Sequence, residues 1–411
     1  MTSTITKPEV STTWRLRHGV GFWVIAFAFL VVMAFSTVPT PLYALYQARD
    51  GFATFLITVI FAAYAVGVMA SLYLAGHVSD WLGRRRVILA AVVIELLAAV
   101  LFLVWPDVPG LLVARFVSGV GVGALTATAT AHLSELRAVA WPKEDGRTSN
   151  TVSSFVNIGG LAFGPLIAGF LAQWVTAPLV VPYVVFLVLL AFAAIGVALV
   201  PETVERWEER PAYRPQRVSL PQASRGTFYS AGAAAFSAFA IFGLFTSLAP
   251  TFIAGTLHET SRFVAGAVTF AVFGAAAVLQ VLTGRLPIVR QLRLAALLMA
   301  TGLVAMSAAV LVVSLPLFVL SGVIAGAGVG VQFRASVAVA ASLALPPSRG
   351  EVLAALFLIA YAGLAVPVLL LGVALTFLSS TTVLLGFSMV VLVLAAWASL
   401  GMSTRMAAQV S

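Results

Sequence analysis

The sequence contains no cysteine, and it has few histidines and few charged residues. Without cysteine there can be no disulfide framework, no thiolate metal ligand and no cysteine nucleophile. The histidines show no HExxH or other paired spacing that would supply a zinc site; they are His18, His77, His132 and His258. We therefore expect no metal and no other cofactor.

The shortage of charge excludes most soluble proteins. Only 9% of the 411 residues are charged, whereas about a quarter are charged in an ordinary soluble domain. Hydrophobic residues make up 61% and the mean hydropathy is +1.08, so polar side chains are too few to cover a globule of this size in water. In a soluble protein the net charge of +9 would suggest nucleic acid. Here we interpret it as the basic excess of cytoplasmic loops and expect no nucleic-acid partner.

Apolar runs of about 20 residues, the length that crosses a bilayer, predict twelve transmembrane helices. A basic tail precedes the first run, as in a signal peptide, but that run is long and ends without a small-residue cleavage site, so we expect a retained helix. The runs are Gly21–Tyr46, Phe52–Leu74, Val87–Trp105, Leu111–Leu133, Ser153–Trp174, Leu179–Val200, Phe228–Phe252, Val264–Leu282, Leu294–Leu315, Leu317–Leu343, Val352–Phe377 and Thr382–Leu400.

The basic residues predict the orientation of these helices. If the N-terminus is cytoplasmic, all of the 23 lysines and arginines fall in cytoplasmic tails and loops except Arg49, Arg262, Arg115 and Arg334. Shifting the frame by one helix would destroy this segregation. We therefore expect a multi-pass protein of the cell inner (cytoplasmic) membrane, with both termini in the cytoplasm, and we expect a monomer.

The longest hydrophilic stretch separates two sets of six runs. A solvated tether is its simplest interpretation. The predicted organisation is a cytoplasmic N-terminal tail (1–20), an N-terminal six-helix bundle (21–200), a cytoplasmic linker (201–227), a C-terminal six-helix bundle (228–402) and a cytoplasmic C-terminal tail (403–411).

Two stretches of small residues recur at the same ordinal position of each set. Ser118–Gly123 in the fourth run matches Ala325–Gly330 in the tenth, and Gly160–Pro165 in the fifth run matches Gly363–Pro367 in the eleventh. A duplicated six-helix unit is typical of secondary transporters, whose substrate site lies between the halves. Small residues also mark close helix packing in any membrane bundle, so they are weaker evidence when taken alone.

The loop between the second and third runs, GHVSDWLGRRR, resembles motif A of the major facilitator superfamily. We expect its acid, Asp80, to dock at the positively polarised start of the eleventh helix and so latch the two halves on the cytoplasmic side, worth up to about 2 kcal/mol. The alternative is a solvated acid in a turn. The matching residues are Gly76, Asp80, Gly83, Arg84, Arg85 and Arg86.

Two further stretches resemble motifs of the twelve-helix drug:proton antiporter branch of that superfamily. The fourth run resembles motif B, with Ser118 replacing the more usual glutamine, and this implies a part in proton transfer for Arg115. Snorkelling to the outer surface is the alternative for Arg115, and Asp50 is its candidate partner. The fifth run resembles motif C, which implies export rather than uptake, although static packing would also use its residues; they are Gly160, Gly164, Pro165 and Gly169.

The resemblance also implies a substrate cavity lined mainly by the first, fourth, seventh and tenth helices. Their aromatic, methionine and hydroxyl side chains, with few charges, suit hydrophobic or amphipathic compounds, although any single aromatic can instead pack or face lipid. Arg334 can contact an anionic substrate group, pair with an acid or snorkel. The cavity candidates are Phe29, Met33, Ser36, Thr40, Tyr43, Thr126, Phe239, Phe242, Thr246, Gln332 and Arg334.

Proton coupling requires a titratable group inside the membrane. Glu95 lies nine residues past Arg86, ~14 Å deep, where a carboxyl group is a functional candidate. However, the resemblance places the third helix at the periphery, and a neutral, hydrogen-bonded Glu95 is the alternative. The first and seventh runs hold no acid at mid-membrane, unlike well-coupled antiporters. The full candidate set is Arg115, Glu95, Asp50, His132 and Glu135.

The sequence thus predicts an all-α polytopic membrane protein of twelve transmembrane helices in two pseudo-symmetric six-helix bundles. We expect a proton-coupled exporter of small hydrophobic or amphipathic compounds, such as drugs or metabolites, working by alternating access. A facilitator or metabolite exporter without obligatory proton coupling is the alternative. No nucleophile–base set or phosphate loop supports an enzyme or a membrane sensor. The expected partners are the small-molecule substrate, protons and the lipid bilayer.

Overall fold

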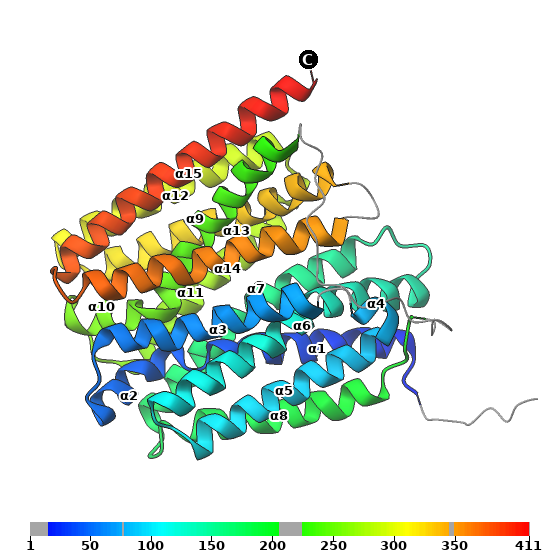
Figure 1. The fold of residues 1–411 in the computed structure, drawn as a ribbon, viewed down its shortest axis with the longest axis horizontal. Coiled ribbons are helices and arrows are strands. Elements are labelled where there is room, and N and C mark those ends of the chain that lie inside the picture. Colours follow the sequence, from blue (N-terminus) through cyan, green and yellow to red (C-terminus); the bar gives the residue numbers. More distant parts are fainter. Residues whose placement is uncertain (1–14, 76–77, 205–223, 345–348, 411) are drawn as a thin grey trace, which may run out of the picture.

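The computed structural model describes residues 15–75, 78–204, 224–344 and 349–410, with side chains described as far as residue 402. Gly76 of the predicted loop motif lies outside these residues, as do most of the predicted N-terminal tail and of the linker, whereas the backbone of the predicted C-terminal tail continues the last helix, which ends at Val410. Within the described part, twelve helical segments are long and apolar enough to cross a membrane. The fold is all-helical, with two pseudo-symmetric bundles of six spans (Figure 1).

The first half of the molecule contains the first six spans. Its elements are α1 (His18–Thr37), η1 (Thr40–Leu42), α2 (Tyr43–Asp50), α3 (Thr54–Ala75), α4 (Ser79–Leu82), α5 (Arg84–Val104), α6 (Val108–Ala140), α7 (Arg147–Trp174) and α8 (Val181–Leu199).

The second half repeats this arrangement. Its elements are α9 (Arg225–Ser247), α10 (Ala249–Gly255), α11 (Arg262–Leu282), η3 (Thr283–Arg285), α12 (Ile288–Leu311), α13 (Leu315–Leu343), α14 (Arg349–Ala374) and α15 (Ser380–Val410).

The first and seventh spans are each broken near one end, where the sequence predicted single helices. α1 stops at Thr37, and Pro39 and Pro41 separate it from α2; in the second half α9 stops just before Pro250. Proline lacks the N–H that continues a helix and restricts the residue before it, which is the physical reason for both breaks. The breaks fall at equivalent positions, so they extend the internal repeat beyond its glycine stretches.

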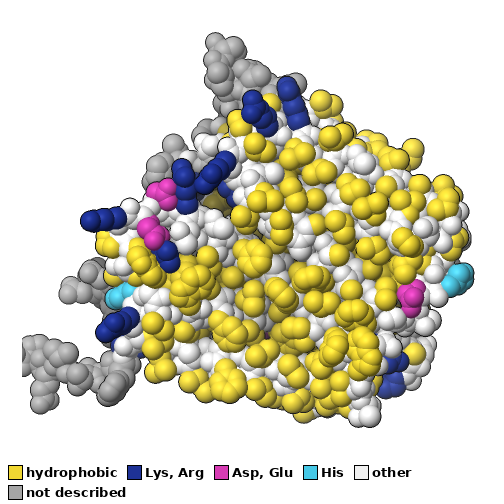
Figure 2. Space-filling view, turned by 180° about the vertical axis from the view of Figure 1, so that it is seen from behind, with side chains coloured by type: hydrophobic (Ala, Val, Ile, Leu, Met, Phe, Trp, Pro, Cys, Tyr) yellow, Lys and Arg dark blue, Asp and Glu magenta, His cyan; other side chains and the backbone are white. Residues whose placement is uncertain are grey.

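The two ends of the bundle differ in charge. We call them the α4 end, on the right in Figure 1, and the α10 end, on the left. Between them, large apolar side chains cover the outside, as at Trp23, Phe192 and Leu370, which are more than half exposed. Figure 2 shows this apolar face with most lysine and arginine side chains gathered at one end. A bilayer would cover such a belt and leave the basic end in water.

The two halves meet along two pairs of helices. α3 packs against α14, and α7 packs against α11. Gly169 of α7 faces Gly266 of α11 so closely that a Cβ atom added to Gly169 would lie 3.2 Å from the Gly266 Cα atom. Glycine permits this approach because it has no side chain to hold the backbones apart.

Candidate functional site

A pocket lies between the halves, with walls from both. In the first half its lining comes from α1, η1, α3, α6 and α7, and in the second half from α9, α11, α13 and α14. The lining residues are Met33, Ser36, Thr37, Thr40, Phe61, Tyr64, Arg115, Thr126, Asn157, Ile158, Leu161, Phe239, Phe242, Thr246, Phe273, Phe333, Phe357, Tyr361 and Leu364. Such a wall is mainly apolar with scattered hydroxyl groups, which is typical of small-molecule sites.

The structure brings seven of the eleven cavity candidates to this pocket. They are Met33, Ser36, Thr40, Thr126, Phe239, Phe242 and Thr246, and Arg115 lines it as well.

The other four candidates lie elsewhere. Phe29 and Tyr43 are buried away from the pocket. The Gln332 side chain donates to Ser399 Oγ of α15 at 3.3 Å. Arg334 neither lines the pocket nor pairs with an acid among the described residues: its guanidinium donates to the backbone oxygens of Gln280 and Gly284, at 3.2 and 3.5 Å. A cation suits that place because the carbonyl groups at the end of a helix carry partial negative charge.

Several lining residues come from helices that the sequence did not indicate as part of the cavity wall. Phe61 and Tyr64 lie on α3, Phe273 on α11, and Phe357 and Tyr361 on α14. A tyrosine in the middle of an apolar run could have indicated a pocket-lining position, because its hydroxyl group needs a polar partner that lipid cannot supply.

Aromatic rings form a continuous wall on the second half. The Phe239 ring lies 4.9 Å from that of Phe333 and 5.5 Å from that of Tyr361, measured between centroids. Phe242 and Phe273 stack at 4.0 Å. Such ring pairs prefer offset or edge-to-face geometry and leave apolar surface toward the pocket.

Arg115 is a buried cation at the pocket wall. Its side chain is 2% exposed, and Nη1 donates to the backbone oxygen of Ser36 at 2.5 Å. The guanidinium lies 4.4 Å from the Tyr64 ring centroid, within the range of a cation–π contact. Nε has no hydrogen-bond partner among the described residues. The alternative interpretation, in which the Arg115 side chain snorkels to the outer surface, is therefore wrong.

Asp50 is not the partner of Arg115. Its carboxylate pairs instead with the guanidinium of the neighbouring residue Arg49, with an N–O distance of 2.6 Å, at the end of α2. Both of these side chains are partly exposed. Two adjacent residues of opposite charge at a helix end satisfy each other locally, which leaves Arg115 without a carboxylate from this loop.

Glu95 is completely buried between α5 and α6. Its carboxyl group lies against Gly121, where an added Cβ atom would come within 2.6 Å of Oε1, and close to Ser118. Neither carboxyl oxygen has a hydrogen-bond partner in the part of the chain that the structure describes. Arg115 lies within electrostatic range of this carboxyl group. An unpartnered acid in such a place is costly and marks a functional candidate.

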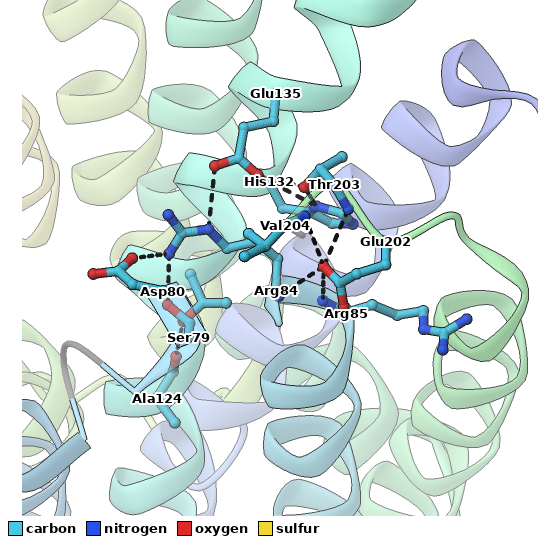
Figure 3. Close-up of polar contacts among 11 residues, drawn as sticks. Ser79, Asp80, Arg84, Arg85, Ala124, His132, Glu135, Glu202, Thr203 and Val204 are labelled. Carbon is cyan, nitrogen blue, oxygen red and sulfur yellow. Dashed lines mark hydrogen bonds and ion pairs between the residues drawn. The ribbon is translucent and has the colours of Figure 1, made fainter. Parts of the chain in front are cut away.

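A second polar cluster lies at the α4 end (Figure 3). Arg84 is at its centre: it pairs with Asp80 at 2.6 Å and with Glu135 of α6 at 3.2 Å, and it donates to Ser79 Oγ at 2.7 Å. Asp80 is 59% exposed. In this conformation the predicted latch acid is thus engaged within its own half, and its docking on α14 stays a prediction.

His132 and Glu135 belong to the same cluster through Thr203. The Thr203 hydroxyl donates to Glu135 Oε2 and lies 2.9 Å from His132 Nδ1 (Figure 3). Thr203 therefore links the side chains of His132 and Glu135 at the α4 end. His132 Nε2 has no partner among the described residues.

Glu202 anchors the start of the predicted linker. Its carboxylate accepts the backbone N–H groups of Arg84, Thr203 and Arg85, at 2.9, 3.1 and 3.4 Å. The first of these belongs to the opening turn of α5, so Glu202 caps that helix with a charge of favourable sign. Residues 201–204 are therefore bound to the first half, and the interpretation of the linker as a solvated tether is wrong for them.

The four residues of the predicted antiporter motif divide between two contacts. Gly160 and Gly164 pack against α1, where a Cβ on Gly160 would lie 2.6 Å from the Met33 Cβ. Gly169 packs across the halves on α11, and the backbone oxygen of Pro165 lies against Gly266 there. Residues of one motif thus pack closely within the first half and also form the contact between the two halves.

The comparisons with known proteins agree with this architecture. The sequence model of the Major Facilitator Superfamily matches residues 25–366. Two uncharacterised MFS-type transporters of Mycobacterium tuberculosis, from strains CDC 1551/Oshkosh and H37Rv, are 27% identical over 161 residues, which is 39% of this chain. The match spans only 23% of the length of those curated relatives.

A solved structure shares the fold across nearly the whole chain. It is that of the human organic anion transporter MFSD10 (TETRAN), with a TM-score of 0.69 and 17% identity over 94% of this chain and 100% of that one. At this identity the likeness concerns the fold alone. The family match, in contrast, runs from the first spanning helix into α14, and it shows that the chain belongs to the Major Facilitator Superfamily of transporters.

Proposed function

We propose that the protein exports small hydrophobic or amphipathic compounds across the inner membrane by alternating access, in exchange for protons. The observation that carries the proposal is the aromatic and hydroxyl-lined pocket enclosed by both halves. A site between two similar bundles can face either side of the membrane when the bundles rock. Both termini and the α4 end lie in the cytoplasm in this proposal, in keeping with the basic side chains gathered there.

The contacts between the halves support a state that is closed at the α10 end. The Arg262 guanidinium of α11 donates to the backbone oxygen of Ala172 in α7 at 2.9 Å, and the Arg262 backbone N–H donates to Gln173 Oε1 at the same distance. The rings of Trp174 and Phe263 meet there at 5.3 Å. In the proposal this is the state in which the pocket exchanges with the cytoplasm through the α4 end and an exporter loads.

In the proposed second state, which is closed on the cytoplasmic side, the polar cluster at the α4 end acts as a latch. When the halves close on the cytoplasmic side, Asp80 docks at the first turn of α14, and Arg84 keeps its bond to Glu135. The present pairing of Asp80 with Arg84 supports this because it holds the exposed acid in place at the surface of the first half. Gly83, with φ of 103°, forms the turn that presents it.

We assign the proton step to Glu95. Its carboxyl group is buried, unpartnered among the described residues and within electrostatic range of Arg115. Asp50, His132 and Glu135 lie toward the two ends of the bundle, where their partners hold them. A carrier that binds a proton on one side and releases it on the other needs a group inside the membrane.

One observation favours a second candidate, facilitated export without obligatory proton coupling. In the part of the chain that the structure describes, no aspartate or glutamate lines the pocket. A substrate therefore meets no titratable carboxyl group directly, and any coupling to Glu95 has to pass through Arg115.

The test of the proposal is uptake of lipophilic dyes and drugs into inside-out vesicles, with and without a proton gradient. Proton exchange predicts gradient-driven uptake that a protonophore abolishes. Facilitated export predicts equilibration that ignores the gradient. If vesicles that contain the protein and vesicles that lack it take up every compound equally, export of this class of compound is wrong.

A further inference from the structure

The pocket between the halves carries an unbalanced positive charge. Among the described residues that line it, Arg115 is the single charged one, and the other polar lining residues, such as Ser36, Thr126 and Asn157, are neutral. The guanidinium group is the cationic end of this side chain. A buried charge is costly unless an opposite charge pairs with it, so this wall of the pocket favours an anion.

The protein itself supplies only part of the coordination that Arg115 can accept. Of its five N–H donors, one is bound to the Ser36 backbone oxygen, and the Nε group is buried without a partner among the described residues. Tyr64 covers one face of the guanidinium. In the described part of the chain, no carboxylate lies within ion-pair distance of Arg115. A planar guanidinium with free donors binds a carboxylate through two parallel hydrogen bonds.

An aromatic wall continues from the same place into the second half. The Tyr64 ring, which covers the guanidinium, lies 6.4 Å from the Tyr361 ring, and Tyr361 lies 5.5 Å from Phe239. The cationic end of the pocket at Arg115 and its apolar end are therefore contiguous, and they belong to different halves of the molecule. A compound that spans them would contact both bundles at once.

We propose that the substrates are small amphipathic monoanions, with a carboxylate bound at Arg115 and an aromatic or other apolar body against Tyr361 and Phe239. This rests on the pocket being the transport site proposed above, and it narrows the substrate class. Lipophilic cations are disfavoured because they would meet Arg115 without a neighbouring acid on the wall. An inside-negative membrane potential drives an anion outward, which suits export with or without proton exchange.

The test uses three probes that share an apolar phenylalkyl body and differ in head group and charge: 4-phenylbutanoate, its amide and 4-phenylbutylammonium. Binding is measured by calorimetry on the purified full-length protein in nanodiscs, so that it is separate from flux. We expect the carboxylate to bind at least about tenfold more tightly than the amide, and the ammonium most weakly. Equal or tighter binding of the amide or the ammonium to the wild-type protein would overturn the proposal.

Two variants locate the effect. Arg115→Gln should weaken carboxylate binding about tenfold, to the level of the amide, and leave amide binding unchanged, whereas Arg115→Lys should keep a preference for the carboxylate. Arg334→Gln is the matched control, because it makes the same change at another arginine within an apolar span, one that does not line the pocket, and it should keep the preference. If Arg115→Gln loses carboxylate and amide binding alike while Arg334→Gln keeps both, Arg115 is structural and the proposal is wrong.

Flux measured with the same probes separates this inference from the proposed function. If all three probes cross liposomes that contain the protein with no preference for the carboxylate, the substrate class is wrong and transport stands. If the carboxylate binds with the expected preference and no probe crosses, the anion site stands and the transport function is wrong.

Discussion

Adding one methyl group at the seam between α7 and α11 should open the α10 end. A Cβ atom on Gly266 would overlap the backbone oxygen of Pro165 and lie 3.3 Å from the Gly169 Cα atom. The obstructing atoms are backbone, so they cannot move aside as a side chain would. Overpacking of this kind costs ~1 to 3 kcal/mol. Since 1.4 kcal/mol corresponds to a factor of ten, Gly266→Ala should shift the equilibrium away from this conformation about 5-fold to 140-fold.

The chain has no cysteine, so a single introduced thiol reports this shift without background. Thr246 lines the pocket in α9, and its hydroxyl bonds only to backbone oxygens of its own helix, so Thr246→Cys is a mild probe. A membrane-impermeant maleimide applied from outside intact cells should label it slowly in the parent. Labelling should become about 5-fold to 140-fold faster when Gly266→Ala is added.

Gly274→Ala provides the matched control on the same helix. A Cβ atom added there would have nothing within 4 Å, so its labelling rate should equal that of the parent. If Gly266→Ala labels as slowly as Gly274→Ala, the close seam does not hold the α10 end shut and the reasoning is refuted.

Three further substitutions test other parts of the account. Asp80→Asn should leave the amount of protein in the membrane unchanged, because an exposed ion pair adds little stability. It should reduce vesicle uptake about tenfold through loss of the latch, and undiminished uptake would show that Asp80 is not a latch. Glu95→Gln should abolish the gradient-driven part of uptake and spare gradient-independent equilibration, and unchanged coupling would move the proton step elsewhere. Glu202→Ala should lower the free energy of unfolding by ~0.5 to 2 kcal/mol through loss of the α5 cap, measured by thermal denaturation in detergent, and an unchanged midpoint would contradict that role.

The number of spans could be predicted from the sequence because each crossing needs a long apolar run, and such runs are unambiguous in a chain with little charge. The proline breaks after Thr37 and Ser247 carried a readable signal as well, in Pro39, Pro41 and Pro250. Hydropathy could not predict which face of each helix lines the pocket. A span that is apolar all round has no polar stripe, so Gln332 and Met33 looked equally suited to the cavity, and only one lines it.

Contacts between residues far apart along the chain could not be predicted from the sequence for a different reason. Arg115 and Arg334 are both arginines within apolar spans, yet one lies at the pocket and the other caps the end of α11. Glu202 and Thr203 follow the last span of the first half and looked like solvent-exposed linker residues. Their partners Arg84 and Glu135 lie far away along the chain, and only the packed bundle brings them together.

In the proposed mechanism, small amphipathic molecules cross the membrane through the pocket between the halves. The most direct test is flux into liposomes that contain purified protein with the pocket filled by a larger side chain. Leu161→Trp places an indole group at the pocket wall, whereas Leu370→Trp places one on the outside of α14, where Leu370 is 65% exposed. We predict that Leu161→Trp abolishes flux and that Leu370→Trp keeps wild-type flux. Equal flux through both variants would contradict the account.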